Sequence, residues 1–450
     1  MQQLVERGAA GRIVIVTSAS ARGAAVVGAS KAIGLEFPEF FICRVFVECD
    51  GRAAPEIAQR AASWATAYAA ETDVIATVRQ ERSPSFRVAR LRSVPLRDTV
   101  PASTSVVPPE LCYVVSGGMG GLGSALVDWL IDEQGVKAES VIVLSRRDKS
   151  HPRGARVITV DVADQSALLA NDQLAGLQNV GGLFHLAAVL EDKLALNVDR
   201  GNLDRTIRPK VGGVANLAKL VSAHGWAPDW LVCFSSTSSM GGFAGQSAYC
   251  AANAALDQLA QWGKSSLPIL TINWGPWAEA GMAAVGTKAY RTAVENGERP
   301  LTNAQGLACL ASVLHSAGAL PGASLQSTAS NCDWPRTPWA GMPLLAAVTA
   351  EPDAVAAAAA PASSSDEEED GENDDGSIDS AVVTFLRQHV PRWDLTASLL
   401  DVGLDSLDTI TIRNKFNKQW KAAAPIELFA PNQTLGELCV RLEQLLGARR

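Results

Sequence analysis

The sequence predicts an α/β protein whose main domain is a doubly wound parallel sheet. Between residues 110 and 345, short apolar runs rich in β-branched residues alternate with longer stretches of helical periodicity. The runs are apolar throughout instead of alternating, which is typical of parallel strands buried on both faces. The runs expected to form strands are Cys112–Ser116, Val141–Ser145, Val157–Val162, Gly182–Ala187, Leu231–Ser235 and Ile269–Trp274.

Residues 1–109, before this domain, show a weaker form of the same alternation of strand and helix patterns. The expected elements are strands at 12–16 and 42–47, a helix near 28–35, and a hairpin of 74–79 with 85–91. The first turn between strand and helix, Thr17-Ser-Ala-Ser-Ala-Arg, has no glycine cluster. A diphosphate would therefore find no close approach to the backbone there.

Two further regions follow the main domain. Residues 346–377 join an alanine run to eight acidic residues within 366–375, with no basic residue among them. This composition predicts a disordered, solvated linker. Residues 378–450 show helical periodicity in three stretches and predict a small helical bundle.

The composition excludes several classes of function. With 39 basic and 47 acidic residues and a net charge of −8, the chain lacks the basic excess that nucleic-acid binding needs. The eight cysteines include no C-x-x-C pair and the five histidines no metal-binding spacing, so no metal site is predicted. The sequence has no signal peptide and no long apolar segment, so we expect a soluble, cytoplasmic protein with no membrane contact, organelle targeting being left open.

A glycine-rich turn follows the first strand of the main domain. The segment Ser116-Gly-Gly-Met-Gly-Gly-Leu-Gly places G-x-G-x-x-G at Gly118, Gly120 and Gly123, with Met119 inside the loop. Such glycines let a diphosphate approach the N–H groups at a helix N-terminus. A tight turn without a ligand is the alternative, but the strand before it and the helix after it favour a dinucleotide.

The residues at the end of the second strand indicate whether the dinucleotide is NAD(H) or NADP(H). A NAD site usually has an acidic residue here, but this chain has Arg146 and Arg147, which suit a 2′-phosphate and favour NADP(H). Asp161, after the third strand, is a candidate for the adenine edge. The alternative is that both arginines are solvated, with Asp148 as a local partner.

Ser236, at a strand end, and Tyr249, entering a helix, carry the resemblance to a known family. The string Phe234-Ser-Ser followed by Gly245-Gln-Ser-Ala-Tyr-Cys-Ala-Ala-Asn resembles short-chain dehydrogenases/reductases. The residue four after the tyrosine is Asn253, and the lysine appears earlier as Lys210. This exchange resembles the ketoreductase domains of modular polyketide synthases and related megasynthases, and the match covers most of residues 110–320.

The resemblance implies a role for each of these residues. Tyr249 would donate a proton to the carbonyl oxygen of a ketone, and Ser236 would hydrogen-bond that oxygen. Lys210 would lower the pKa of the tyrosine and hold the nicotinamide ribose, and Asn253 would help fix a proton relay. NADPH would be the cofactor.

The resemblance also bears on the product and on the domains. Leu190-Glu-Asp is similar to the family's Leu-Asp-Asp signature of D (3R) alcohols; Asp192 matches and Glu191 does not, and Gly241 stands where the opposite type has Trp. Residues 1–109 match the truncated structural subdomain of the family, a degenerate Rossmann half. Because that subdomain normally begins earlier, we expect the chain to be a fragment or one piece of a split megasynthase.

The last segment resembles an acyl carrier protein. The string Leu400-Asp-Val-Gly-Leu-Asp-Ser-Leu matches the carrier motif, so Ser406 would bear a covalent 4′-phosphopantetheine; an N-cap serine is the alternative. The following helix carries a basic run where such carriers are often acidic: Arg413, Lys415, Lys418 and Lys421.

The sequence therefore predicts residues 110–345 as an NADPH-dependent ketoreductase subdomain, fused through the linker to a carrier, 378–450. The expected reaction reduces 3-ketoacyl thioesters to 3-hydroxyacyl thioesters in polyketide synthesis. Expected partners are a phosphopantetheinyl transferase and, in cis or trans, ketosynthase and acyltransferase domains. The alternatives are a catalytically silent scaffold with a functional carrier, and a free short-chain dehydrogenase of small carbonyl compounds.

Overall fold

A computed structural model gives the architecture of the chain in two compact units, residues 11–350 and, in the second, residues 351–450 with 1–10. Each unit is described by itself. The structure describes residues 11–38, 40–49, 59, 73–78, 85–88, 90–91, 105–262, 267–318, 325–340, 342–346, 348, 381–422, 424–430 and 432–447. The predicted linker lies almost entirely outside the described residues.

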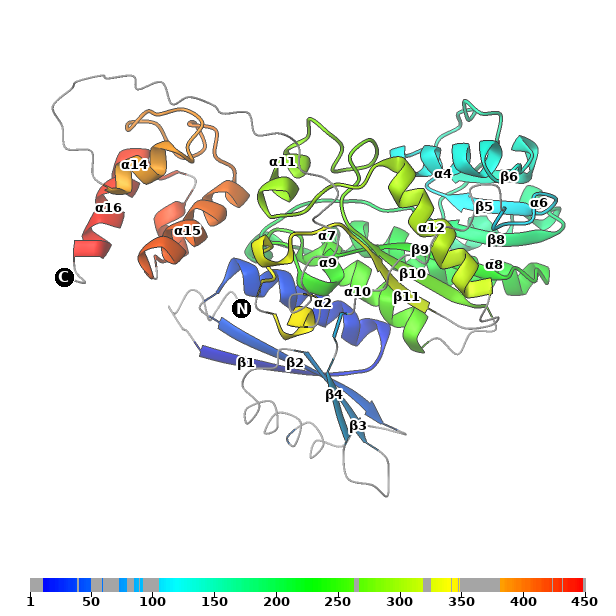
Figure 1. Ribbon diagram of the computed structural model, residues 1–450, viewed down its shortest axis with the longest axis horizontal. Coiled ribbons are helices and arrows are strands. Elements are labelled where there is room, and N and C mark those ends of the chain that lie inside the picture. Colours follow the sequence, from blue (N-terminus) through cyan, green and yellow to red (C-terminus); the bar gives the residue numbers. More distant parts are fainter. Residues whose placement is uncertain are drawn as a thin grey trace. The chain divides into compact units, whose positions relative to one another are not determined.

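The first unit contains a seven-stranded, all-parallel sheet in the order β11-β10-β9-β8-β5-β6-β7 (Figure 1). This confirms the predicted doubly wound α/β fold. The strands are β5 (Cys112–Ser116), β6 (Val141–Ser145), β7 (Arg156–Thr159), β8 (Val180–His185), β9 (Trp230–Ser236), β10 (Ile269–Trp274) and β11 (Leu325–Ala329). The last of these was not predicted.

Helices cover both faces of this sheet, and each face has its own apolar core. Alternate strand residues enter the two cores: Tyr113 and Val115 pack with α4 and α12, whereas Val114 packs on the other face with α8. The helices are α4 (Gly121–Asp132), α5 (Gln165–Leu169), α6 (Asp172–Ala175), α7 (Arg200–Ile207), α8 (Gly213–His224), α9 (Ser238–Gly241), α10 (Ser247–Trp262), α11 (Lys288–Glu295) and α12 (Asn303–Gly318). Short 3₁₀ turns are η1 (Ala138–Ser140), η2 (Ala195–Asn197), η4 (Trp334–Arg336) and η5 (Pro343–Leu345), and η3 (Arg208–Gly212) is a π-turn.

The strand order reverses beside β5. From β5 the chain moves outward to β6 and β7, and it then returns to β8 on the other side of β5. Because all seven strands are parallel, their carboxyl ends lie along one edge of the sheet. Ligands of such sheets bind outside the carboxyl ends where the order reverses.

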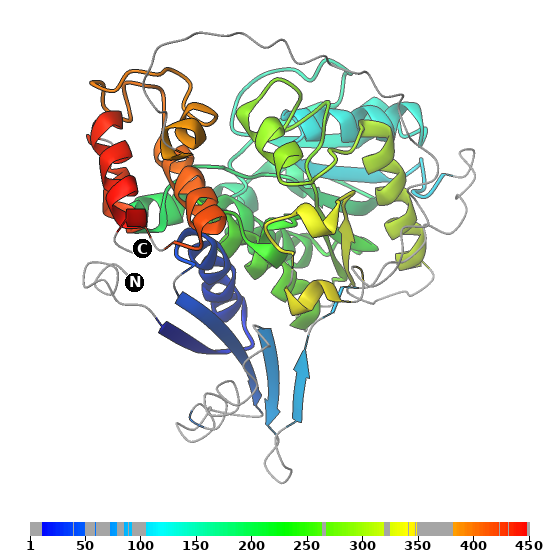
Figure 2. The ribbon, with the colours of Figure 1, turned by 60° about the vertical axis from the view of Figure 1, so that its left-hand side comes forward.

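A smaller, four-stranded sheet belongs to the same unit (Figure 2). Strands β1 (Gly11–Ser18), β2 (Phe40–Cys49) and β3 (Asp73–Val78) are parallel, and β4 (Ser85–Val88) pairs with β3 as the predicted hairpin. Helix α2 (Ala21–Glu36) lies between this sheet and α10. A Cβ on Gly28 would lie 2.3 Å from the Cys250 carbonyl oxygen, so glycine lets the two helices approach closely. The Leu91 N–H also donates to the Leu344 oxygen at 2.7 Å.

The second unit contains the predicted helical bundle. Its helices are α14 (Ala381–Arg387), α15 (Ser406–Trp420), η7 (Ile426–Phe429) and α16 (Leu435–Gly447). They enclose one core with Phe385, Phe416 and Leu438 among its buried residues. Among the described residues of the whole chain, no helix is long and apolar enough to cross a membrane.

Candidate active site and carrier attachment site

The glycine turn after β5 has the form that a dinucleotide phosphate requires. Gly120 is the N-cap of α4, and no side chain caps this helix. A Cβ on Gly118 would lie 2.9 Å from Val143, and one on Gly123 would lie 2.2 Å from the Gly117 oxygen. The turn therefore brings bare backbone to the start of a helix, where N–H groups and the helix dipole favour an anion. Met119 of the same turn packs partly against the core.

Arg146 and Arg147 follow β6 at the same edge of the sheet, and both are exposed. The Ser145 hydroxyl bonds both the N–H and the carbonyl oxygen of Arg147, each at 3.0 Å, and so fixes the start of this turn. Within the part of the chain that the structure describes, no carboxylate forms an ion pair with either guanidinium, including Asp148. Two unpaired guanidinium groups next to the glycine turn fit the extra phosphate of NADP(H).

The connector between β6 and β7 contributes a residue that the sequence did not indicate. His151 is 4% exposed, and its Nδ1 accepts the Arg153 N–H at 3.3 Å. Burial lowers the pKa of His151, and the charge of Asp128 opposes this change. The connector contains no helix, as expected. Asp161, beyond β7, accepts the Ala163 N–H at 2.9 Å.

Tyr249, Ser236 and Asn253 come together from β9 and the first turns of α10. Ser236 ends β9 and Tyr249 is the third residue of α10 (Ser247–Trp262), with both side chains partly buried. Asn253 is fully buried and donates to the Tyr249 carbonyl oxygen at 3.0 Å. Burial raises the pKa of Tyr249, and the neighbouring side chains of Asn253 and Ser236 act on it in the opposite direction.

Lys210 reaches this group from the π-turn η3. Its Nζ donates to the Phe234 oxygen at 2.9 Å and lies 5.2 Å from the centre of the Tyr249 ring. His185 holds the turn: its Nε2 lies 2.9 Å from the Lys210 carbonyl oxygen, and its Nδ1 lies 2.6 Å from the Ser116 hydroxyl. A carbonyl only accepts, so Nε2 carries the proton and Ser116 donates to Nδ1. Burial lowers the pKa of His185 to about 4, which keeps the ring neutral at pH 7.

The pKa of Tyr249 is shifted in the direction opposite to the expected one. The prediction that Lys210 lowers the pKa of Tyr249 is wrong for this structure. Burial is the largest effect and raises the pKa of Tyr249 to about 12, with a further increase from the charge of Asp192. Burial also lowers the pKa of Lys210 to about 8. Desolvation is the largest cause for both groups, and neither is a cause of the other's pKa shift.

A buried polar network next to Ser236 was also missed in the sequence. The Asn273 side-chain amide donates at 2.7 Å to both Asp257 and Ser239, and Ser239 donates to Asp257 at 2.5 Å. Asp257 is 6% exposed, and its charge raises the pKa of Lys210 against the effect of burial. No local motif marks such a network, because its members come from three separate elements.

Of the expected stereocontrol residues, Asp192 lies near enough to Tyr249 for its charge to raise the pKa of the hydroxyl. Asp192 is exposed and accepts from the Gln246 side chain at 3.4 Å, while Leu190 is partly buried. Glu191, the departure from the family signature, forms a two-pronged pair with Arg205 at 2.7 and 2.8 Å, which lowers its pKa to about 2. Glu191 thus holds this loop to α7 and leaves Asp192 on the side of Tyr249.

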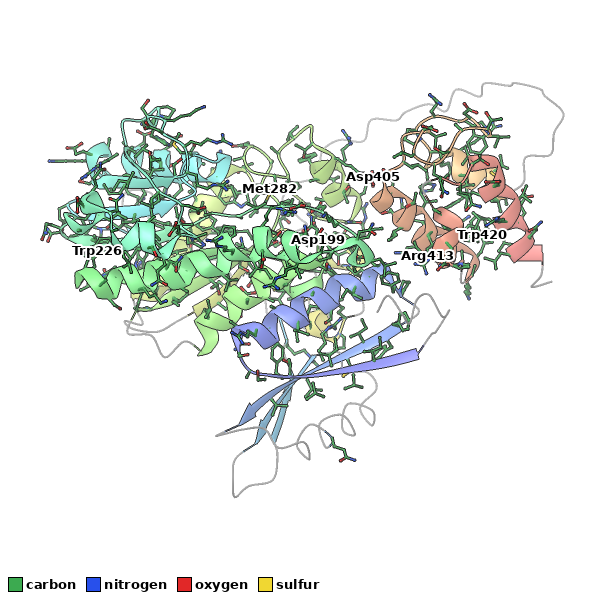
Figure 3. The ribbon with its side chains drawn as sticks, turned by 180° about the vertical axis from the view of Figure 1, so that it is seen from behind. Asp199, Trp226, Met282, Asp405, Arg413 and Trp420 are labelled. Atoms are coloured by element: carbon green, nitrogen blue, oxygen red, sulfur yellow. The ribbon has the colours of Figure 1, made fainter. Side chains whose placement is uncertain are left out.

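Gly241 has no room for a side chain. A Cβ there would lie 2.3 Å from the indole of Trp339, which is 2% exposed and donates to the Gly242 oxygen at 2.8 Å. Trp339 comes from the segment after β11 and so fills the space beside Gly241. Figure 3 shows the side chains of this unit, with Met282 of the loop after β10 labelled. In that loop Gly281 approaches Gly121 so closely that a Cβ on Gly121 would lie 2.7 Å from its nitrogen.

Ser406 is the first residue of α15. The Asp405 carboxylate accepts the Asp408 N–H at 2.9 Å, and the Asp408 carboxylate accepts the Asp405 N–H at 3.0 Å. This reciprocal capping box makes Asp405 the N-cap, so the alternative that Ser406 is the cap is wrong. Of the basic run, Lys415, Lys418 and Lys421 are exposed. Arg413 is instead buried in the bundle and donates to the Ala424 oxygen at 2.8 Å (Figure 3).

Comparison with known proteins finds the same two parts. The family described as "KR domain" matches residues 112–279, and the family described as "Phosphopantetheine attachment site" matches residues 378–442. The chain is 28% identical over 371 residues to a component of the phenolphthiocerol/phthiocerol polyketide synthase of Mycobacterium tuberculosis, covering 76% of this chain and 19% of that protein. It is also 28% identical to the pikromycin polyketide synthase component PikAII of Streptomyces venezuelae, covering 75% of this chain and 10% of that protein.

Solved structures match a similar share of the chain. The chain matches a structure described as an A1-type ketoreductase with a TM-score of 0.63 and 25% identity, covering 77% of this chain and 75% of that one. It matches the first ketoreductase of the tylosin PKS with a TM-score of 0.61 and 25% identity, over 77% of each chain. The chain spans only about a fifth of the length of the first curated relatives that it matches.

Proposed function

Because the chain consists of a polyketide-synthase ketoreductase domain followed by a phosphopantetheine carrier domain, we propose that it reduces 3-ketoacyl thioesters to 3-hydroxyacyl thioesters with NADPH. Acyl groups would be carried as thioesters on a 4′-phosphopantetheine attached to Ser406. The observation that carries the proposal is the meeting of Tyr249, Ser236 and Lys210 beside a bare glycine turn at the carboxyl edge of the sheet.

In this mechanism Tyr249 supplies a proton. Reduction of a ketone leaves negative charge on its oxygen, and a hydroxyl with a pKa of about 12 is protonated at pH 7 and ready to donate. Ser236 donates a second hydrogen bond to the same oxygen and stabilises the developing charge. NADPH, when bound, supplies the hydride.

Lys210 and Asn253 complete the site. The Lys210 ammonium, anchored on the Phe234 oxygen, lies beside the tyrosine ring, where it would hold the nicotinamide ribose. Asn253 is bound to the backbone of Tyr249 and would help the proton return to the hydroxyl. The glycine turn with Arg146 and Arg147 would hold the phosphates.

We assign the D (3R) alcohol as the product. Support comes from Asp192, which matches the last position of the family's D signature, and from Gly241, where Trp339 leaves no room for the Trp of the opposite type. Support for a cytoplasmic site of action comes from the cysteines whose side chains the structure describes, seven of the chain's eight, all of which are free thiols such as a reducing compartment maintains. The proposed partners are a phosphopantetheinyl transferase and the ketosynthase and acyltransferase domains that extend the acyl chain.

The test of catalysis is the loss of NADPH absorbance when the protein is mixed with a 3-ketoacyl thioester. Tyr249→Phe is expected to slow the reaction about 10²- to 10⁴-fold, which is the usual contribution of a general acid. Tyr113→Phe serves as the matched control and should react like the wild type, because Tyr113 lies at the start of β5, the opposite end of that strand from the glycine turn, and its hydroxyl donates to the Pro108 oxygen. A wild type that oxidises no NADPH would leave only the silent scaffold, and a preference for small free ketones would favour a free dehydrogenase.

The carrier is tested separately by mass. A phosphopantetheinyl transferase with coenzyme A should add one phosphopantetheine to the wild type and none to Ser406→Ala. Ser398→Ala is the control, because this serine lies in the same unit and bonds Asp401 instead. Equal labelling of Ser406→Ala and wild type would refute the assignment of the attachment site.

A further inference from the structure

The carboxylate of Glu36 links the smaller sheet to two loops beside the active site. Glu36 is the last residue of α2 and is fully buried. Its Oε1 accepts the Gly245 N–H at 2.9 Å, and its Oε2 accepts the Ala195 N–H at 2.8 Å. One side chain from outside the seven-stranded sheet thus holds two backbone segments at a fixed separation.

The two segments flank the reacting groups. Gly245 lies four residues before Tyr249 and has a φ of +77°, and Ala195 lies three residues after Asp192. The loops are also joined directly, since the Lys193 N–H donates to the Gly245 oxygen at 2.8 Å. Gly245 therefore has both its donor and its acceptor engaged in setting the distance between the two loops.

Helix α2 contacts the same region at a second place. Lys31 Nζ donates to the Ser239 oxygen at 3.2 Å, and a Cβ on Gly242 would lie 2.6 Å from the backbone of Lys31. Burial raises the pKa of Glu36, and the two backbone hydrogen bonds lower it. Burying a carboxylate destabilises a protein unless its oxygens accept hydrogen bonds. Each oxygen of Glu36 accepts one from a backbone N–H.

We propose that Glu36 is a positioning residue for the reduction. It fixes the loop at 190–195, which carries Asp192, against the loop at 243–247, which leads into Tyr249. The separation of these loops sets where an acyl thioester lies relative to the tyrosine, and so controls both its binding and the face of the ketone that is reduced. This inference rests on the proposed function.

The test uses Glu36→Gln, which has the same shape but turns one accepting oxygen into an NH₂ that faces a backbone N–H. We expect the KM for the thioester to rise about tenfold and the ratio of the two alcohol stereoisomers to fall, because small displacements of reacting groups have large effects. The KM for NADPH should stay within about twofold of the wild type. Glu36→Asp keeps both acceptors and should restore part of the selectivity.

The matched control is Ser30→Ala on the same helix. It removes the buried bond from Arg44 Nε to the Ser30 hydroxyl, 2.7 Å long, and Ser30 has no hydrogen bond to either loop. Glu36→Gln and Ser30→Ala with equal kinetics and equal stereoisomer ratios would show a merely structural role and overturn the proposal.

Hydrogen–deuterium exchange supplies a readout that does not need activity. Peptides spanning 191–197 and 243–248 should exchange faster in Glu36→Gln than in Ser30→Ala or the wild type. Equal exchange in all three proteins would overturn the proposal even if the wild type reduced no thioester. An inactive wild type with faster exchange in Glu36→Gln would refute the proposed function and leave the positioning role of Glu36 standing.

Discussion

The two sheets of the first unit each begin with a strand, a turn, a helix and a parallel strand, but their turns differ at the helix N-terminus. In the smaller sheet, Ser20 is the N-cap of α2 and its hydroxyl accepts the Gly23 N–H at 3.2 Å. In the larger sheet, Gly120 caps α4 without any side-chain bond. The first helix satisfies its own N-terminal donor, and the second leaves its N-terminus open to an anion.

The glycines of the two turns show the same contrast. A Cβ on Gly23 would lie 2.0 Å from the Ser18 oxygen, and one on Gly123 would lie 2.2 Å from the Gly117 oxygen. Both glycines are needed for the close packing of strand and helix. Only the second turn adds further bare glycines and a pair of arginines after the next strand, so the shared backbone arrangement alone does not create a cofactor site.

The largest expected effect comes from placing the same methyl group in each turn. Gly123→Ala should weaken NADPH binding more than about a hundredfold, because the added Cβ displaces the phosphate turn. Both substitutions should lower the Tm by a similar amount. Gly23→Ala should nevertheless leave the NADPH affinity of the folded protein unchanged. Fluorescence titration of NADPH and thermal unfolding measure both. Equal loss of affinity in the two variants would contradict the distinction between the turns.

A second contrast concerns the arginines. Replacement of both Arg146 and Arg147 by alanine should weaken NADPH binding about 10- to 100-fold, as expected for the loss of charge-assisted hydrogen bonds of about 1.5–3 kcal/mol. NADH, which lacks the 2′-phosphate, should bind with unchanged affinity. Arg22→Ala, an exposed arginine in the first turn of α2, is the matched control. A parallel fall in NADH affinity would show that the arginines do not read the 2′-phosphate.

A third expected effect depends on Lys210, the buried lysine of η3. Burial lowers the pKa of Lys210 to about 8, so the charged form is complete well below pH 8 and is lost as the pH rises through this value. The kcat/KM should therefore fall about tenfold per pH unit above that point, if the ammonium holds the cofactor ribose. In Lys210→Arg the falling limb should disappear, because arginine stays charged. A flat profile in the wild type would contradict this role.

The smallest expected effect is a difference in stability between variants of two buried glutamates, Glu36 and Glu298. Glu298 is 3% exposed, its Oε1 has no hydrogen-bond partner, and burial raises its pKa to about 7 from the ordinary 4.5. The folded state therefore holds the proton more tightly, and this group's contribution to stability is present at pH 4 and lost as the pH rises toward 7.

Glu298→Gln should consequently stabilise the protein by about 1–2 kcal/mol at pH 8 and have no such effect at pH 4. Glu36→Gln should destabilise at both pH values, because it breaks one of two satisfied hydrogen bonds. Urea unfolding at the two pH values measures both variants. A Glu298→Gln protein that is less stable than the wild type at pH 8 would contradict the assignment.

Much of the fold could be predicted because buried parallel strands have an unmistakable apolar pattern. Five of the six predicted strands of the large sheet differ from the structure by no more than two residues at either end; the third, predicted at 157–162, ends at Thr159. Strand β11 was missed because Leu-Gln-Ser-Thr-Ala is largely polar and lies at the sheet edge. Edge strands need no continuous apolar run.

The candidate site also contains residues that the sequence indicated and residues that it did not. Tyr249, Ser236, Lys210 and Asn253 could be proposed as site residues because their local sequences resemble those of a known family. Glu36, His151 and Asp257 could not, because each acts through contacts with residues far along the chain and lies in no recognisable motif. The pKa of Tyr249 was mispredicted for a related reason: burial is a property of the whole fold and does not follow from residue spacing.

The segment after β11 has a consequence for how such units can be exchanged between proteins. The Trp339 indole packs against Gly241, and the Leu344 oxygen accepts a hydrogen bond from the Leu91 N–H. Residues that follow the last strand therefore complete the packing of the ketoreductase domain. A chimera cut directly after β11 would leave a hole of indole size under the loop that leads to the tyrosine. Recombination that replaces the carrier should therefore keep the chain through Leu345, with the junction placed between that residue and α14.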